Sequence, residues 1–239
     1  MEALSSLKLS HILFLDIETV PLQPSYEELS PIERSLWEDK TRYIRQEVPA
    51  EDYYERAGIW AEFGKIVCIS VGYFVVKNGQ RQFRVRSFVG EERDILEDFS
   101  YLVNQFFSGR EHLLAAHNGK EFDFPFIARR MLILGLALPQ KLQLFGKKPW
   151  ELGFLDTLDL WKFGDYKHYT SLNLLAYVLG IPSPKDDITG AGVRAVYYQE
   201  QDIARIAQYC QKDTLTVAQI LLRMRGEPLL EPEEIHYAT

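Results

Sequence analysis

The chain has 239 residues, 46% of them hydrophobic and 13% aromatic, which is enough to bury one sizeable core, so we expect a single α/β domain over residues 1–239. Its net charge of −7 argues against a surface that holds polyanions through an excess of Lys and Arg, although carboxylates that bind divalent cations lose that repulsion locally. No apolar run reaches the roughly 18 residues that span a bilayer, and the two cysteines have no disulfide or metal spacing, so we expect a cytoplasmic protein without membrane contact.

Three apolar runs predict the first strands of a sheet. His11–Asp16 is a continuous apolar run that ends in an acid, which is typical of a buried central strand. Lys65–Val76 and Gln82–Val89 predict two further strands, joined by Lys77–Gln80, where Asn-Gly is a strong hairpin signal.

A polar stretch between the first two strands, Pro21–Gly58, shows no strand pattern and predicts a helical excursion from the core. It carries the aromatic residues Trp37, Tyr43, Tyr53 and Tyr54. These side chains could stack on the bases of a single strand, but aromatic residues at such spacing more often dock onto their own domain.

Helical and strand patterns alternate after the hairpin. Glu91–Phe107 predicts an amphipathic helix whose apolar stripe is formed by Ile95, Leu96, Phe99, Leu102, Val103 and Phe106. His112–Ala116 predicts a short buried strand, and Phe122–Leu134 predicts a helix that tolerates Pro125 in its first turn.

The last third of the chain predicts a strand over Phe154–Thr157, a helix over Leu172–Leu179, and a long helix from about Gln201 to Arg225. A sheet that opens with a hairpin and continues through β-α-β units indicates an α/β fold with a mixed sheet of five to six strands, flanked by helices.

Asp16 and Glu18 form the first of three acidic motifs. Residues two apart in a strand point to the same face, so both carboxylates can face one side of the sheet at the carboxyl end of the first strand. Open α/β sheets bind ligands at that edge. A charged strand end is also commonly just solvated, so this pair alone does not establish a site.

The second motif ends in Asp123, which follows a tight turn and begins a predicted helix. The helix dipole favours a carboxylate there, and a plain N-terminal cap explains Asp123 equally well. Asn118 could brace the turn through its backbone or touch a substrate.

In the third motif, Tyr209 and Asp213 are four residues apart on the final helix and share one face. A surface hydrogen bond alone could explain them. All three motifs together, on elements that can converge at the first strand, are better explained by a site than by coincidence. Oxygen ligands without Cys or His suit Mg²⁺ or Mn²⁺, and paired ions of that kind cleave phosphodiesters.

The set Asp16, Glu18, Asp123 and Asp213 with Tyr209 resembles the DEDDy branch of the 3′-5′ exonucleases, which have a ribonuclease H-like fold. The resemblance runs from about residue 10 to 224. Flanking segments are similar to those of stand-alone bacterial proteins related to the exonuclease domain of B-family DNA polymerases: Phe63–Ser70 and Leu179–Lys185. The sister branch has a histidine five residues before the last acid, where this chain has Gln208.

The resemblance implies a role for each residue. Asp16 would bridge two divalent cations, Mg²⁺ or Mn²⁺, while Glu18 and Asp213 complete the ion that binds the attacking water. Asp123 would hold the second ion directly or through water. Tyr209 would orient the attacking water by a hydrogen bond, because a tyrosine with an ordinary pKa of about 10 is a poor base at neutral pH.

Further residues are expected near the site. Thr19, Asn118 and Phe122 are candidates for substrate binding, and Asp156 either supports the metal ligands or caps the following helix. For His117 and His168 we expect structural or loop roles.

We therefore expect a 3′-5′ exonuclease that removes 5′ mononucleotides from single-stranded DNA by a two-metal mechanism. RNA is an alternative substrate. Contacts to the 2′ hydroxyl distinguish RNA from DNA, and the sequence does not locate them. A non-catalytic module that docks on a replication or repair protein is a third reading. Acidic net charge favours it, but no expected metal ligand is missing.

Overall fold

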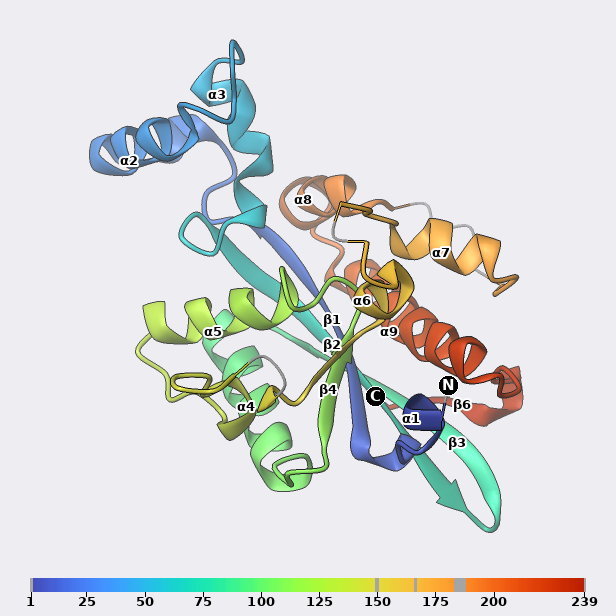
Figure 1. The fold of residues 1–239 in the computed structure, drawn as a ribbon. Helices are drawn as coiled ribbons and strands as arrows, with labels where there is room; N and C mark the ends of the chain where they lie inside the picture. The colour runs from blue at the N-terminus through green and yellow to red at the C-terminus, as the bar shows by residue number, and fades with distance from the viewer. Residues whose placement is uncertain (1, 149–150, 166, 183–187, 239) are drawn as a thin grey trace.

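The computed structural model describes residues 2–148, 151–165, 167–182 and 188–238, so the end of Leu179–Lys185 lies outside the described residues. Its centre is a six-stranded sheet in the order β5-β4-β1-β2-β3-β6 (Figure 1). The strands are β1 Ile12–Pro21, β2 Gly64–Lys77, β3 Gln80–Val89, β4 Leu113–Ala116, β5 Phe154–Asp156 and β6 Ile235–Tyr237. Because β1–β2 and β2–β3 are antiparallel pairs and the other pairs are parallel, the expected mixed sheet is confirmed.

Helices flank both faces of the sheet, with α4 and α5 on one face and α9 on the other (Figure 1). The helices are α1 Glu2–Ser5, α2 Pro31–Thr41, α3 Ala50–Tyr53, α4 Glu92–Phe106, α5 Asp123–Ile133, α6 Thr157–Lys162, α7 Leu172–Val178, α8 Val193–Ala195 and α9 Ile203–Arg225. A π-helical turn, Val196–Glu200, precedes α9. Among the described helices, none combines the length and apolarity needed to cross a membrane.

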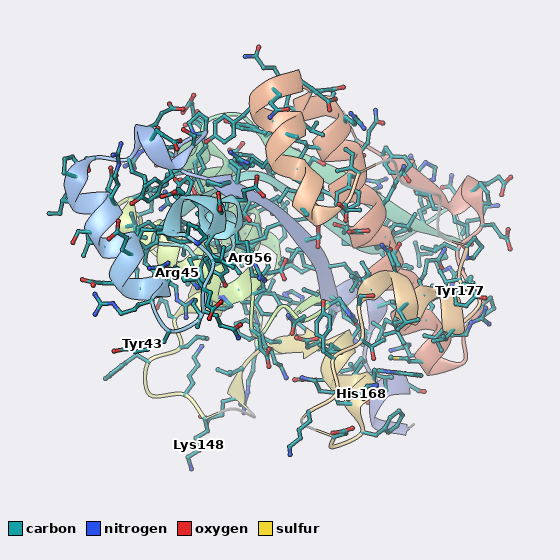
Figure 2. The ribbon with its side chains drawn as sticks, turned by 90° about the horizontal axis from the view of Figure 1, so that it is seen from above. Tyr43, Arg45, Arg56, Lys148, His168 and Tyr177 are labelled. Carbon is teal, nitrogen blue, oxygen red and sulfur yellow. The ribbon has the colours of Figure 1, made fainter. Side chains whose placement is uncertain are left out.

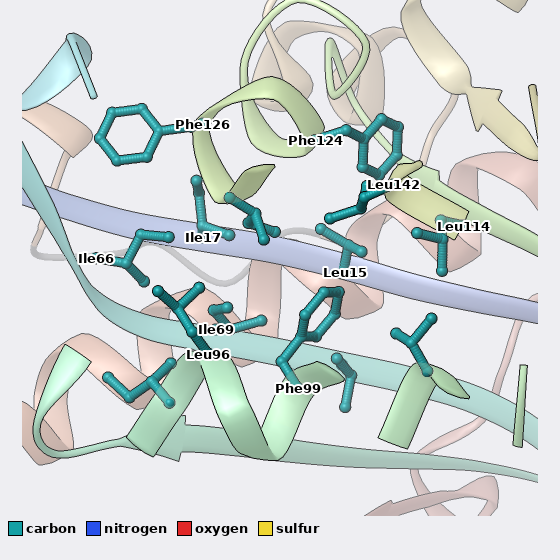
Figure 3. Close-up of a cluster of buried hydrophobic side chains, with 14 of the residues drawn as sticks. Leu15, Ile17, Ile66, Ile69, Leu96, Phe99, Leu114, Phe124, Phe126 and Leu142 are labelled. Atoms are coloured by element: carbon teal, nitrogen blue, oxygen red, sulfur yellow. The ribbon is translucent and has the colours of Figure 1, made fainter. Parts of the chain in front are cut away.

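Alternation along β1 decides which side chains meet which helix. The odd-numbered residues Leu13, Leu15 and Ile17 pack with α4 and α5, as Figure 3 shows for Leu15 and Ile17 beside Phe99 and Phe124. The even-numbered residues Ile12 and Phe14 pack instead with α9. Asp16 and Glu18 continue the even series and therefore face α9.

One strand boundary differs from the expectation in a way that bears on the acids. β1 does not end at Asp16 but continues to Pro21, because β2 is long enough to pair with it as far as Gly64. The two acids therefore lie inside the strand and not at its carboxyl end. The register shifts between Glu18 and Thr19, a bulge of the kind that re-aims neighbouring side chains.

Three smaller expectations also need correction. Phe106 does not belong to the buried stripe of α4: it is 61% exposed, and Phe107, beyond the helix end, turns inward in its place. Thr157 begins α6 instead of ending β5. The short strand β6, which pairs with β3, was not expected, because three residues carry no detectable period.

The excursion between β1 and β2 lies beyond one end of the sheet and contains α2 and α3 (Figure 1). Its own small core encloses Trp37, which is fully buried and donates from Nε1 to the Ala50 carbonyl oxygen at 2.8 Å. Tyr54 is also buried against Trp37. Stacking on bases is therefore excluded for Trp37 and Tyr54, whereas Tyr43 is exposed and projects from the excursion (Figure 2).

Candidate metal-binding active site

Asp16 and Glu18 are side by side on the α9 face of β1. Their partners on β2 are Ser70 and Cys68, two small side chains that leave room for the carboxylates. Glu18 is buried, and one ligand atom each from Asp16, Glu18 and Cys210 of α9 lie within 4.8 Å of one another. The expected convergence of the strand acids with the last helix is thus present in the structure.

Asp123 reaches the same place from α5. β4 pairs with β1 only as far as Phe14 and Ala115, and beyond that point the segment leading into α5 lies along this edge of β1. The Asp123 carboxylate accepts a hydrogen bond from the backbone N–H of Ile17, the residue between the two strand acids. As the first residue of α5, Asp123 also accepts from its own N–H. The helix start and the strand together fix this carboxylate.

Tyr209 and Asp213 come from the first half of α9, which is anchored on the sheet by buried Ile206, Cys210 and Thr214. Tyr209 and Asp213 form a side-chain hydrogen bond, as their i, i+4 spacing allows. The sequence-predicted pair therefore lies beside the strand acids and interacts with them electrostatically.

Burial and mutual repulsion raise the pKa values of Asp16, Glu18 and Asp123. For Asp16, burial raises the pKa most, followed by the negative charges of Glu18, Asp213 and Asp123. Burial also dominates for Glu18, and it raises the pKa of Asp123 to about 7. Such a cluster is poorly tolerated as free anions in a low dielectric, and a bound cation removes this penalty.

The pKa of Tyr209 is raised far above its ordinary value, first by burial and then by the charges of Asp213, Glu18 and Asp16. The phenol is therefore protonated at neutral pH. It can donate a hydrogen bond, but it cannot serve as a base.

Asp156 does not join the cluster of facing carboxylates but braces the turn before α5. Its Oδ1 accepts from the N–H of Asn118 and of Leu158, both at 2.9 Å, and its Oδ2 accepts from the N–H of Lys120 at 3.0 Å. It is thus the N-terminal cap of α6 and the support of the turn at once. Its charge also contributes to the raised pKa of Asp123.

The candidate substrate residues are placed around this centre. The Thr19 hydroxyl donates to the Gly58 carbonyl oxygen at 2.7 Å, so its proton is committed within the protein. Asn118 has a positive φ of 61° and braces the turn, since its carbonyl oxygen accepts from the N–H of Glu121 and Phe122. Phe122 is partly buried against the core beside Phe126.

The two histidines lie where structural roles are expected. His117 uses both ring nitrogens, Nδ1 with Thr157 Oγ1 at 2.9 Å and Nε2 with the Thr170 carbonyl oxygen at 2.8 Å. His168 is exposed beside Asp165. Neither belongs to the acidic centre.

Sequence reasoning missed Cys210, for which it noted only the lack of disulfide or metal spacing. The Cys210 Sγ donates to Asp16 Oδ2 at 3.3 Å, and it also contacts Cys68. The available signal was its position between Tyr209 and Asp213, on the turn of α9 that faces β1. No composition or spacing rule singles out such a lone thiol.

The donor set fits divalent cations. Four carboxylates supply hard oxygen ligands, the raised pKa values of Asp16, Glu18 and Asp123 reflect burial and a repulsion that a cation relieves, and the facing phenol stays protonated. Asp16, Glu18, Asp123 and Asp213 are the residues that could hold the ions.

The fold is similar to that of a solved polymerase structure. The family B DNA polymerase from the hyperthermophilic archaeon Pyrobaculum calidifontis superimposes with a TM-score of 0.51 at 18% sequence identity, over 88% of this chain. The chain spans 24% of that polymerase's length. The likeness defines the chain as an α/β protein with a ribonuclease H-like fold, as expected.

The family follows from residues 59–229, which match the model of predicted 3′-5′ exonucleases related to the exonuclease domain of PolB. The chain belongs to this family. Asp123, Tyr209 and Asp213 lie within the matched residues, whereas Asp16 and Glu18 precede them. A search of the curated proteins finds no match.

Proposed function

We propose that the protein is a metal-dependent 3′-5′ exonuclease that degrades single-stranded DNA to 5′ mononucleotides by a two-metal mechanism. The observation that carries the proposal is the convergence of acids from three elements: Asp16 and Glu18 of β1, Asp123 of α5 and Asp213 of α9. Each of the first three experiences the charge of Asp213, and Tyr209 is hydrogen bonded to it.

The residues divide the work by position. Asp16, at the centre of the cluster, would contact both ions, with Glu18 and Asp213 completing one coordination sphere and Asp123 the other. Two Mg²⁺ or Mn²⁺ ions held by these carboxylates would supply the charge that activates a water and stabilises the leaving 3′ oxygen. Tyr209, held by Asp213 and protonated, orients the attacking water.

A cleft of about 330 Å³ lies between Thr19, near the end of β1, the excursion, and residues 190–194. Glu55, Arg56 and Arg194 line it, and the Arg194 guanidinium already donates to the Pro24 carbonyl oxygen and pairs with Glu55. Arg56 gives this cleft a guanidinium that can bind a phosphate of a single strand despite the acidic net charge of the chain.

The test is digestion of matched 5′-labelled single-stranded DNA and RNA of one sequence, with Mg²⁺, with Mn²⁺ and with a chelator. The proposal expects a metal-dependent ladder that shortens the DNA from its 3′ end. Faster shortening of the RNA copy would show that RNA is the preferred substrate. If DNA and RNA both stay intact with either metal, a non-catalytic docking module explains the protein better.

A further inference from the structure

A second cluster of potential metal ligands lies at the start of β1, away from the acids. The parallel pairing of Ile12 with Leu113 brings the preceding residues, His11 and His112, side by side. Their rings are 4.8 Å apart between centroids, at 80°, and one ligand atom from each of His11, Glu111 and His112 lie within 4.8 Å of one another. His11 and Asp16 are five positions apart along the strand, roughly 16 Å.

A polar atom in this cluster lacks a partner. The His112 side chain is 20% exposed, and its Nδ1 is buried without a hydrogen bond to any described residue. Buried ring nitrogens are normally satisfied, as both nitrogens of His117 are. The unpaired atom therefore points to a missing ligand.

Gly109 packs closely against two of the candidate ligands. A Cβ on Gly109 would lie 3.1 Å from His112 Nδ1 and 3.0 Å from Glu111 Oε1. A side chain at this position would therefore press on both the imidazole and the carboxylate.

Neighbouring charges favour ligation on balance. Burial, together with His11, lowers the pKa of His112, which keeps the imidazole in the neutral form that binds metals. Glu111 is ionised, its pKa being lowered first by a hydrogen bond from its own N–H. Lys141 is the opposing cation, but its Nζ is bound to the carbonyl oxygens of Gly109 and His112 at 2.6 Å and 2.5 Å.

We propose that His11, Glu111 and His112 bind a transition-metal ion of the Zn²⁺ class, which clamps the start of β1 to the start of β4. Two imidazoles and one carboxylate suit Zn²⁺ and its neighbours, in contrast to the all-oxygen set of the acidic centre. Bonds of about 2.0–2.1 Å in a tetrahedral site require ligand atoms roughly 3.4 Å apart. The ligand atoms, which lie within 4.8 Å of one another, must therefore move closer together, and the exposed Glu111 side chain can supply most of that movement. Water can fill the fourth position.

The experiment titrates the full chain with Co²⁺, read from its visible absorption, and with Zn²⁺, read by calorimetry. The variants are His11→Gln and His112→Gln, with His168→Gln, an exposed histidine beside Asp165, as the matched control (Figure 2). Asp16→Asn separates this cluster from the acidic centre. Gly109→Ala keeps both imidazoles and places a side chain against two of the ligands.

Each cluster variant is expected to bind the ion at least about tenfold more weakly, since loss of even an indirect support costs that much. His168→Gln should bind as the wild type does, and Asp16→Asn should keep the binding that His11→Gln loses. Because the acidic centre can also take a divalent cation, the increase in melting temperature on adding Zn²⁺ should vanish in the double variant Asp16→Asn with His11→Gln, whose melting temperature without metal should equal that of Asp16→Asn alone. Undiminished binding in His11→Gln and Gly109→Ala, or loss of binding in Asp16→Asn, would overturn the proposal.

Discussion

The Sγ of Cys210 donates a hydrogen bond to Oδ2 of Asp16 at 3.3 Å, which links α9 directly to the carboxylate at the centre of the acidic cluster. This bond lowers the pKa of Asp16 against the larger effects of burial and neighbouring acids. The thiol therefore helps Asp16 to stay ionised, the form in which it can bind a cation.

Replacement of Cys210 by Ala is expected to raise the pKa of Asp16 and to move the acidic limb of the pH–activity profile toward higher pH, because protons then compete better with the metal. Cys210→Ser keeps a donor and should leave the profile near that of the wild type. Activity measured across pH at a fixed, subsaturating Mg²⁺ concentration checks this. Equal profiles for the Ala and Ser variants would show that the bond has no electrostatic role.

Asp156→Ala is expected to destabilise the protein by about 2–4 kcal/mol, since three backbone N–H groups lose a buried acceptor. The matched control is Asp202→Ala, which removes the exposed cap of α9 and one bond to Arg205 N–H, for about 1 kcal/mol. Urea unfolding measures both. Equal losses would mean that Asp156 serves only as a helix cap.

Tyr209→Phe is expected to lower kcat on the order of 10- to 100-fold while leaving metal affinity nearly unchanged, because the phenol orients a reactant and is no ligand itself. Tyr101→Phe, on the exposed side of α4, provides the control. Steady-state kinetics with a labelled oligonucleotide separate kcat from KM. A fall in metal affinity without a fall in kcat would contradict the assigned role.

The metal-free protein should become less stable as pH rises. Burial raises the pKa of Asp123 to about 7, well above the ordinary value of an aspartate, so the folded state holds this proton more tightly than the unfolded state. Its contribution to stability is complete below the unfolded value and is lost as pH rises through about 7.

Thermal unfolding in a chelator at several pH values from about 5 to 8 tests this linkage. Asp123→Asn cannot titrate, so its melting temperature should fall less steeply than that of the wild type over the same range. Mn²⁺ should stabilise the wild type more at the upper end of the range, where protons no longer compete. Parallel pH curves for the two proteins would exclude a raised pKa at Asp123.

Much of the sheet could be predicted because its signals are local: an unbroken apolar run for β1 and an Asn-Gly turn between β2 and β3. The end of β1 was misjudged because strand length depends on the partner, here β2 through Gly64, and not on the strand's own residues. Phe106 was misplaced because α4 ends at this residue, and Phe107, which follows the helix, fills the buried position instead.

The acids could be singled out by their spacing and their element types, and the structure brings them together as expected. The supports could not be predicted. Asp156 acts through three backbone N–H groups from two segments, and Cys210 acts through one contact across 194 residues of sequence. Such contacts exist only once the chain is folded, so no periodicity or motif records them.

The most direct test of the shared acidic centre is the rate at which Asp16→Asn removes nucleotides from the 3′ end of single-stranded DNA. Asn keeps the size of the side chain and removes the charge that every other acid of the cluster repels. We expect the metal-free Asp16→Asn protein to be at least as stable as the wild type and its rate to be indistinguishable from that of the chelator control. A folded Asp16→Asn protein that degrades DNA at the wild-type rate would contradict it.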